Sequence, residues 1–115
     1  MTSEPTIAKL AKAIDFLGRF SAFSPNMQVS TVMTLLEIAR ADLTGQSIST
    51  QDIERRVGLL SGTASRNIYY WEKGHKEMSG GHDFVSVGFG ADRRRRSLEL
   101  TPKGRAFVLA STEPL

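Results

Sequence analysis

Apolar residues near the start of the chain recur at helical spacing. They fall three or four residues apart between Glu4 and Phe20, and so lie along one side of a helix. This apolar stripe consists of Ile7, Leu10, Ala11, Ile14, Leu17 and Gly18. Pro25 ends the pattern, because proline disfavours helical geometry in the residue before it, and a second amphipathic helix is expected from there to about Ala41. The stripe needs a partner, which the sequence leaves open between the chain's own core and a second copy.

Two short helices around a tight turn are predicted next. The first covers residues 50–57, after a capping serine or threonine, and ends at Gly58. The second covers residues 61–73. Its inward side is expected to consist of Ala64, Ile68 and Trp71. Two helices joined in this way are a helix-turn-helix signal, which we place at about residues 49–73.

Beyond the helix-turn-helix the pattern changes from helix to strand. Glycines interrupt the helical periodicity, and aromatic and β-branched residues favour strands at 83–89 and 96–100. The two strands form a predicted hairpin, or wing, at about residues 83–100. The end of this hairpin carries four consecutive arginines, Arg93, Arg94, Arg95 and Arg96. Thr101 and Pro102 then open a final helix, because threonine is a good N-cap and proline suits the first helical position.

The order of these elements predicts the fold class. A run of helices with a tight turn, then a hairpin and a last helix, is the order of a winged helix-turn-helix, which is mainly α with a small β-hairpin wing (α+β). A length of 115 residues suits one domain, so residues 1–115 are expected to form a single unit. A hydrophobic fraction of 40% and a charged fraction of 23% are ordinary for a chain that folds.

Charge and cysteine content narrow the function. The net charge is only +3, but positive residues gather near the C-terminal end, where Lys103 and Arg105 follow the four arginines. A positive hairpin favours an anionic partner such as nucleic acid. The chain has no cysteine, which excludes disulfides, thiolate metal ligands and a cysteine nucleophile. Because it also shows neither a membrane-length apolar run nor a basic signal-peptide start, we expect a cytoplasmic, nucleoid-associated protein.

Two segments of the chain resemble the MarR family of transcription regulators. Residues 48–72 read ISTQDIERRVGLLSGTASRNIYYWE and resemble the family's helix-turn-helix. Residues 93–107 read RRRRSLELTPKGRAF and resemble its wing strand followed by the recurring L-T-P-K-G, here residues 100–104. Asp92 and Arg94 also match the family's D-x-R pattern. For that pattern the resemblance implies a carboxylate that braces an arginine in a DNA groove.

The resemblance implies a sequence-specific, DNA-binding transcription regulator that acts as a homodimer. We expect a repressor, because a compact chain offers little surface for recruiting polymerase. MarR proteins usually dimerise through the N-terminal helix and long C-terminal helices, but this sequence ends about one short helix after the L-T-P-K-G motif. We therefore expect a shortened dimerisation region, with the apolar stripe as a candidate substitute, and the shortening argues against a small-molecule effector.

Candidate DNA contacts lie on the second helix of the helix-turn-helix and on the wing. A helix about 10 Å wide fits the major groove of B-DNA. The predicted contacts are Ser61, Thr63, Ser65, Arg66, Asn67 and Tyr69 on the helix, and Arg93, Arg94, Arg95 and Arg96 on the wing. Arg66 could bind guanine through two hydrogen bonds, and Gly62 would let the backbone approach closely. The wing arginines are expected to enter a minor groove or bind phosphates.

Other functions fit the sequence less well. A winged helix can also bind a protein such as polymerase, a replication factor or a host regulator, and a basic wing can serve an architectural protein of low specificity. No enzyme activity is expected, because no nucleophile motif positions the serines and histidines as in hydrolases. His75 and His82 lack a clear third ligand, so we expect both in solvent, with no metal and no cofactor.

Overall fold

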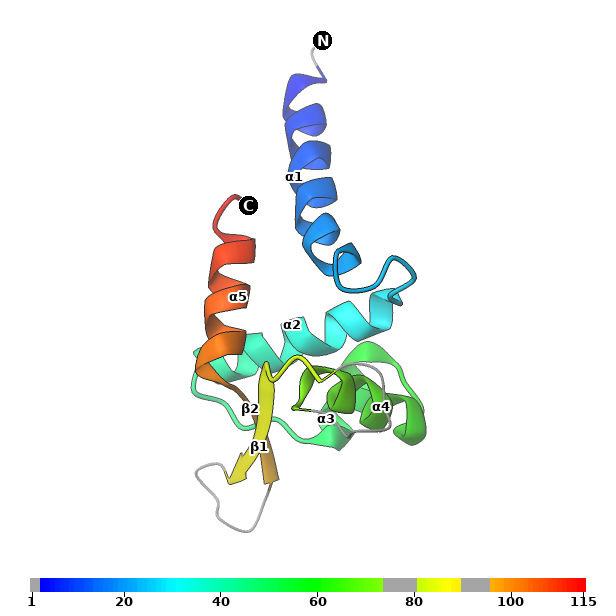
Figure 1. Cartoon of the computed structure of the whole chain (residues 1–115), viewed down its shortest axis with the longest axis vertical. Helices are drawn as coiled ribbons and strands as arrows, with labels where there is room; N and C mark the ends of the chain where they lie inside the picture. Colours follow the sequence, from blue (N-terminus) through cyan, green and yellow to red (C-terminus); the bar gives the residue numbers. More distant parts are fainter. Residues whose placement is uncertain (1–2, 74–80, 90–95) are drawn as a thin grey trace.

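The computed structural model describes residues 3–73, 81–89 and 96–115 (Figure 1). In chain order its elements are α1 (Glu4–Ser21), α2 (Val29–Leu43), α3 (Thr50–Val57), α4 (Ser61–Trp71), β1 (Val85–Phe89), β2 (Arg96–Leu100) and α5 (Pro102–Thr112). Within the described residues the two strands pair in one antiparallel hairpin. The predicted fold class is confirmed, since these elements form a mainly helical winged helix-turn-helix.

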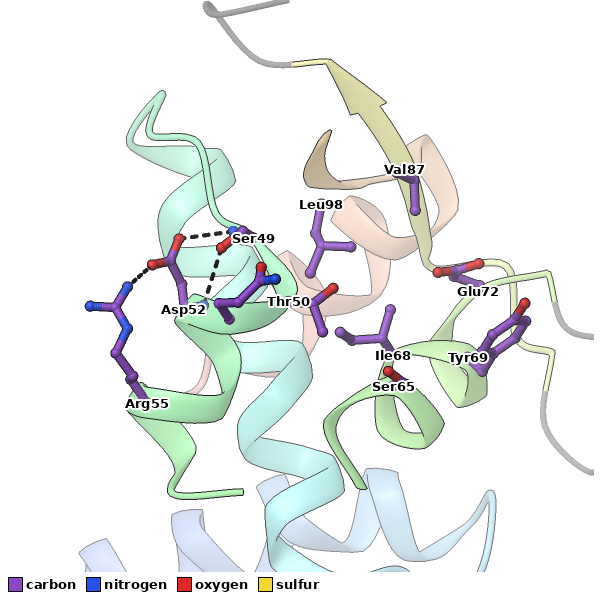
Figure 2. A pocket seen from close by; sticks show the side chains of 11 residues that line it. Ser49, Thr50, Asp52, Arg55, Ser65, Ile68, Tyr69, Glu72, Val87 and Leu98 are labelled. Carbon is purple, nitrogen blue, oxygen red and sulfur yellow. Dashed lines mark hydrogen bonds and ion pairs between the residues drawn. The ribbon is translucent and has the colours of Figure 1, made fainter. Parts of the chain in front are cut away.

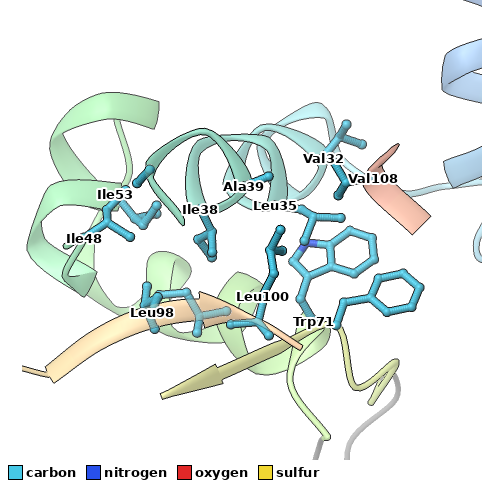
Figure 3. Packing of buried hydrophobic residues seen from close by; sticks show 14 of the residues in the cluster. Val32, Leu35, Ile38, Ala39, Ile48, Ile53, Trp71, Leu98, Leu100 and Val108 are labelled. Carbon is cyan, nitrogen blue, oxygen red and sulfur yellow. The ribbon is translucent and has the colours of Figure 1, made fainter. Parts of the chain in front are cut away.

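The hydrophobic core surrounds α2, which runs across the middle of the molecule (Figure 1). Leu35 and Ile38 of α2 are fully buried, with Trp71 of α4 and Leu98 of β2 on the side of α2 that faces the hairpin (Figure 3). Each such aliphatic side chain stabilises the fold by about 1.5–3 kcal/mol when it is fully buried. The indole nitrogen of Trp71 donates a hydrogen bond of 2.7 Å to the carbonyl oxygen of Thr31, so its one polar atom is satisfied. The predicted core position of Trp71 is confirmed.

Local interactions set the two ends of α3. The hydroxyl of Ser49 accepts a hydrogen bond from the Asp52 backbone N–H, and the Asp52 carboxylate accepts one from the Ser49 backbone N–H. This capping box holds the pKa of Asp52 below its usual value, chiefly through the bond from the Ser49 backbone. Gly58 ends the helix with a φ of 80°, a left-handed conformation that a glycine adopts without strain. The predicted boundaries of this helix are confirmed.

The hairpin is attached to the segment that precedes α3. The backbone N–H of Leu98 donates a 2.8 Å hydrogen bond to the carbonyl oxygen of Ile48, and the Ile48 N–H donates to the Ser97 hydroxyl. β1 begins at Val85, two residues later than predicted, because Asp83 has a positive φ of 59° that a strand does not accommodate. The base of the wing is therefore held against the helix-turn-helix.

The L-T-P-K-G segment joins the hairpin to α5 through a close backbone approach. The Thr101 hydroxyl accepts a hydrogen bond from the Gly104 N–H and donates one to the carbonyl oxygen of Asp83. A Cβ atom on Gly104 would lie 2.0 Å from the carbonyl oxygen of Phe84. Glycine is thus the residue that lets the first turn of α5 lie directly against the chain before β1.

Among the described residues, α1 packs into the core near its C-terminal end. Phe20 is buried and packs edge-on against Trp71, and Phe16 packs against Phe20. Phe16 follows Ile7 by about two and a half helical turns, so it lies on the opposite side of the helix from the apolar stripe. The stripe itself faces solvent. Its large members Ile7, Leu10, Ile14 and Leu17 are all more than half exposed. The sequence left open whether the stripe packs in the chain's own core or against a second copy, and the first of these alternatives is wrong.

Candidate nucleic-acid interface

α4 has one face in the core and one in solvent. Ala64, Ile68 and Trp71 are buried, as predicted. The solvent face carries the predicted contacts Ser61, Ser65, Arg66 and Tyr69, all exposed, and the half-buried Thr63. Because the buried face packs against α2 and α3, the polar face is held in a fixed orientation. A helix of this kind can enter a groove without rearrangement.

Asn67 does not belong to this surface. Its side chain is only 7% exposed and forms hydrogen bonds with two threonines of α2. The Thr31 hydroxyl donates to its Oδ1 at 3.1 Å, and its Nδ2 donates to the Thr34 hydroxyl at 3.4 Å. The prediction of Asn67 as a DNA contact is wrong. The spacing could have revealed this, since Asn67 lies three residues after Ala64 and four before Trp71, on the inward side of the helix.

An open groove of about 740 Å³ lies beside the solvent face of α4 (Figure 2). Its walls are the start of α3 on one side and the end of α4 with β1 on the other. Ile68 and Leu98 lie between these walls, with Tyr69, Glu72 and Val87 on the hairpin side. The groove thus separates α3 from the wing.

The groove contains charged groups that the sequence did not single out. Arg55 forms an ion pair with Asp52 at the α3 wall. Glu72, at the end of α4, is partly buried, and burial raises the pKa of its carboxyl above the ordinary 4.5. Arg66, by contrast, has no carboxylate partner among the described residues, and its guanidinium donates one hydrogen bond of 3.4 Å to the Thr63 hydroxyl. Its other donors are available to an outside ligand.

Most of the predicted wing contacts fall outside the described residues. Arg93, Arg94 and Arg95 lie there together with Asp92. Arg96 begins β2, and its backbone pairs with that of Phe89 in the hairpin. β1 ends and β2 begins at the end of the hairpin that lies away from α5 (Figure 1). In the sequence, the arginine segment connects these two points.

His82 lies in an aromatic cluster and not in solvent as predicted. Its ring centroid is 4.5 Å from that of Phe23, 4.9 Å from Tyr70 and 5.5 Å from Trp71. Burial, and then the charge of Lys103, lowers the pKa of His82 below 6.5. Its Nε2 is buried without a hydrogen-bond partner in the described structure. His75 lies outside the described residues, and among those described no three His, Cys, Asp or Glu side chains are grouped to bind a metal.

None of the helices in the described part of the chain has the length and apolar character needed to cross a bilayer.

Comparison with solved structures identifies the fold. S. aureus MepR bound to ethidium bromide aligns with a TM-score of 0.66 and 15% identity over 99% of this chain and 75% of its own. A structure of the S. aureus MepR–DNA complex aligns with a TM-score of 0.63 and 19% identity over 95% of this chain and 77% of its own. A structure of MarR aligns with a TM-score of 0.58 and 19% identity, over 99% of this chain and 75% of its own.

Comparison of the sequence alone finds no relative among sequence families or curated proteins. The similarity to MepR and MarR is therefore one of three-dimensional structure, and it extends over almost the whole chain. It agrees with the helix-turn-helix and L-T-P-K-G segments on which the sequence resemblance rests. The chain has the winged helix-turn-helix fold of MarR-type regulators.

Proposed function

We propose that this protein is a sequence-specific DNA-binding transcription regulator. The observation that carries the proposal is the division of α4 into a sealed apolar face and a rigid polar face, beside a hairpin whose sequence bears four arginines. The fold of a protein solved in complex with DNA supports it. A polar helix and a cationic hairpin side by side suit successive grooves of one duplex.

The polar face of α4 enters the major groove. Arg66 binds guanine through two parallel hydrogen bonds, for which its unpaired guanidinium is available. Ser61, Ser65 and Tyr69 bind base edges or phosphates, and Thr63 orients Arg66. Asn67 does not contact DNA but stabilises the position of α4 through its hydrogen bond with Thr31 of α2.

The wing supplies the second contact. Guanidinium groups of Arg93–Arg96 neutralise phosphates or enter the neighbouring minor groove, where negative potential is concentrated. Arg94 is the principal wing contact, and the MarR resemblance assigns Asp92 to brace it. Such contacts add affinity without much discrimination between sequences.

The regulator acts as a homodimer that represses by occluding a promoter. The exposed stripe on α1 is the surface that supports this assignment, because four large apolar side chains on one helix face have no cover in the described chain. α1 and α5 extend from the same side of α2, opposite the hairpin (Figure 1). Pairing there leaves both copies of α4 free to read a two-fold related site in the cytoplasm.

Selection from a pool of random duplexes tests the proposal. The wild-type protein is expected to enrich one motif over scrambled competitor DNA, with an affinity that falls at least about tenfold between 50 and 200 mM salt. Arg66→Ala should relax the sequence preference at one position, whereas Arg94→Ala should weaken binding to all sequences.

Arg105→Ala is the matched control for both variants. It removes the same charge from α5, where the Arg105 guanidinium lies 3.4 Å from the carboxylate of Asp42 in the last turn of α2. Its DNA binding should equal that of the wild type. If Arg66→Ala and Arg94→Ala also bind like the wild type while remaining folded, the assigned surface is wrong. DNA binding by the wild type without enrichment of a motif would favour an architectural protein of low specificity, and absence of DNA binding would favour a protein-binding role.

A further inference from the structure

Leu60 is the most exposed of the large apolar side chains that the structure describes, at 82%. It lies immediately before the first turn of α4, the end of a recognition helix that reaches furthest into a major groove. A single exposed leucine is common on protein surfaces. Its position and its surroundings are what distinguish this one.

The turn between α3 and α4 holds Leu60 outward. The N–H groups of Gly58 and Leu59 both donate to the carbonyl oxygen of Glu54, and the Leu59 side chain packs against the core. The carbonyl oxygen of Leu60 accepts a 2.9 Å hydrogen bond from the Ala64 N–H and so begins the helix. Because these bonds fix the backbone on both sides of Leu60, they also fix the direction of its Cα–Cβ bond, and the side chain lies in solvent.

Helix stability does not explain a leucine at this position. Leu60 is the N-cap of α4, with the extended backbone typical of a cap, yet no side-chain bond caps the helix. Serine, threonine, aspartate or asparagine would supply that bond. Ser49 caps α3 and Thr101 caps α5 in this way, whereas α1 and α2 also begin without a side-chain cap. An exposed apolar cap therefore destabilises α4 and gains no burial in return.

Gly62 is a second residue at this end of α4 that does not favour the helix. Glycine destabilises a helix relative to alanine. A Cβ atom on Gly62 would meet nothing within 4 Å, so packing inside the chain does not require glycine here. The leading end of α4 thus presents an apolar projection next to bare backbone. Two locally unfavourable residues, separated only by Ser61, indicate a surface shaped by something outside the chain.

We propose that Leu60 is a specificity-determining residue that packs against the 5-methyl group of thymine in the major groove. This inference rests on the proposed function. The thymine methyl is the apolar group that base pairs present on the major-groove edge, and Gly62 allows the backbone to come close enough for contact. A protein partner is less favoured, because the adjoining Ser61, Gly62 and Thr63 do not extend Leu60 into an apolar patch.

Replacing thymine with deoxyuridine tests the contact directly, because it removes only the methyl group. In the motif selected by the wild-type protein, one thymine per half-site should lose about fourfold in affinity when substituted. Leu60→Ala should weaken binding to the thymine-containing site by a similar or larger factor. This variant should no longer distinguish thymine from deoxyuridine.

Leu60→Ser separates this role from folding. A serine N-cap should raise the melting temperature of the protein by about 3–5 °C, while affinity for the selected motif falls and the deoxyuridine effect disappears. A change that stabilises the fold and weakens DNA binding cannot act through unfolding. Leu60→Met should retain both the affinity and the preference for the methyl group.

The outcomes distinguish this inference from the proposed function. If the wild type selects no motif, the proposed function fails, and the inference fails with it. If the wild type selects a motif but Leu60→Ala and Leu60→Ser keep its affinity and the deoxyuridine effect, Leu60 does not read thymine and the regulator assignment stands. Loss of binding by Leu60→Met as well as by Leu60→Ser would also overturn the methyl contact.

Discussion

α1 and α4 are both amphipathic helices, but their apolar faces have opposite fates. The apolar face of α4 is sealed against α2 and α3, with Trp71 wholly buried. The apolar stripe of α1 lies in solvent, and that helix is held instead by Phe16 and Phe20 near its end. The apolar face of α4 is thus covered within one chain, while the apolar stripe of α1 is left uncovered in the described chain. A helical period shows that a face exists and not what covers it.

The largest expected effect comes from the sealed face of α4. Trp71→Ala should destabilise the protein by about 3–5 kcal/mol, because it opens a cavity in the core and leaves the carbonyl oxygen of Thr31 without its donor. Urea unfolding followed by circular dichroism measures the change. Tyr69→Ala, on the exposed face of the same helix, is the control and should cost less than about 1 kcal/mol. Similar losses for the two variants would contradict the two-faced description of α4.

The next effect belongs to the open face of α1. Ile14 is 70% exposed, so Ile14→Gln should leave the folding of one chain unchanged but weaken a dimer that buries it. Loss of two buried isoleucines, at about 1.5 kcal/mol each, corresponds to a roughly 100-fold higher dimer dissociation constant. Sedimentation velocity over a range of concentrations measures it. Lys12→Gln, on the other side of α1, should have no effect, and a wild-type protein that stays monomeric at all concentrations would refute the dimer.

A smaller effect is expected at the buried polar contact between α4 and α2. Asn67→Ala should destabilise the protein by about 1–3 kcal/mol, since it removes the partner of two threonine hydroxyls in a buried position. DNA affinity measured well below the melting temperature should stay close to wild type. A large loss of affinity without loss of stability would instead restore Asn67 to the DNA-contacting surface.

The smallest effect lies where the segment after α1 meets the end of α4. His82 packs between Phe23 and Tyr70, and burial lowers its pKa below 6.5. The folded state therefore holds the neutral ring, and stability should decline as the pH falls through 6.5, because the unfolded chain then binds the proton more readily. His82→Phe should keep the packing and flatten this decline in melting temperature between pH 7.5 and 5.5. An unchanged pH profile would show that other groups cause it.

The sequence predicted the elements well wherever local chemistry sets them. Ser49 and Gly58 bound α3 as expected, and the Thr101–Pro102 pair opens α5. The predicted outward positions of Ser61, Ser65, Arg66 and Tyr69 agree with their exposure on α4. These features follow from capping, backbone preference and helical period, which act within a few residues.

What the sequence did not show is contact between distant segments. Helical spacing places Asn67 on the inward side of α4, but it does not show that threonines more than thirty positions earlier satisfy its amide. His82 seemed to lie in a polar loop, yet rings from three parts of the chain enclose it. The groove that brings Glu72 opposite α3 also depends on how the hairpin docks. Single-sequence patterns carry no information about which segments meet.

The sequence alone determined the order of helices and strands, the L-T-P-K-G connection and the charge of the wing, because each depends on neighbouring residues. Only the tertiary structure decided that two threonines of α2 bind the Asn67 side chain, that His82 is enclosed, and that the α1 stripe has no cover within the described chain. Burial depends on packing between segments far apart in the chain. Whether a side chain is exposed to water or buried in the core is therefore decided only when those segments pack together.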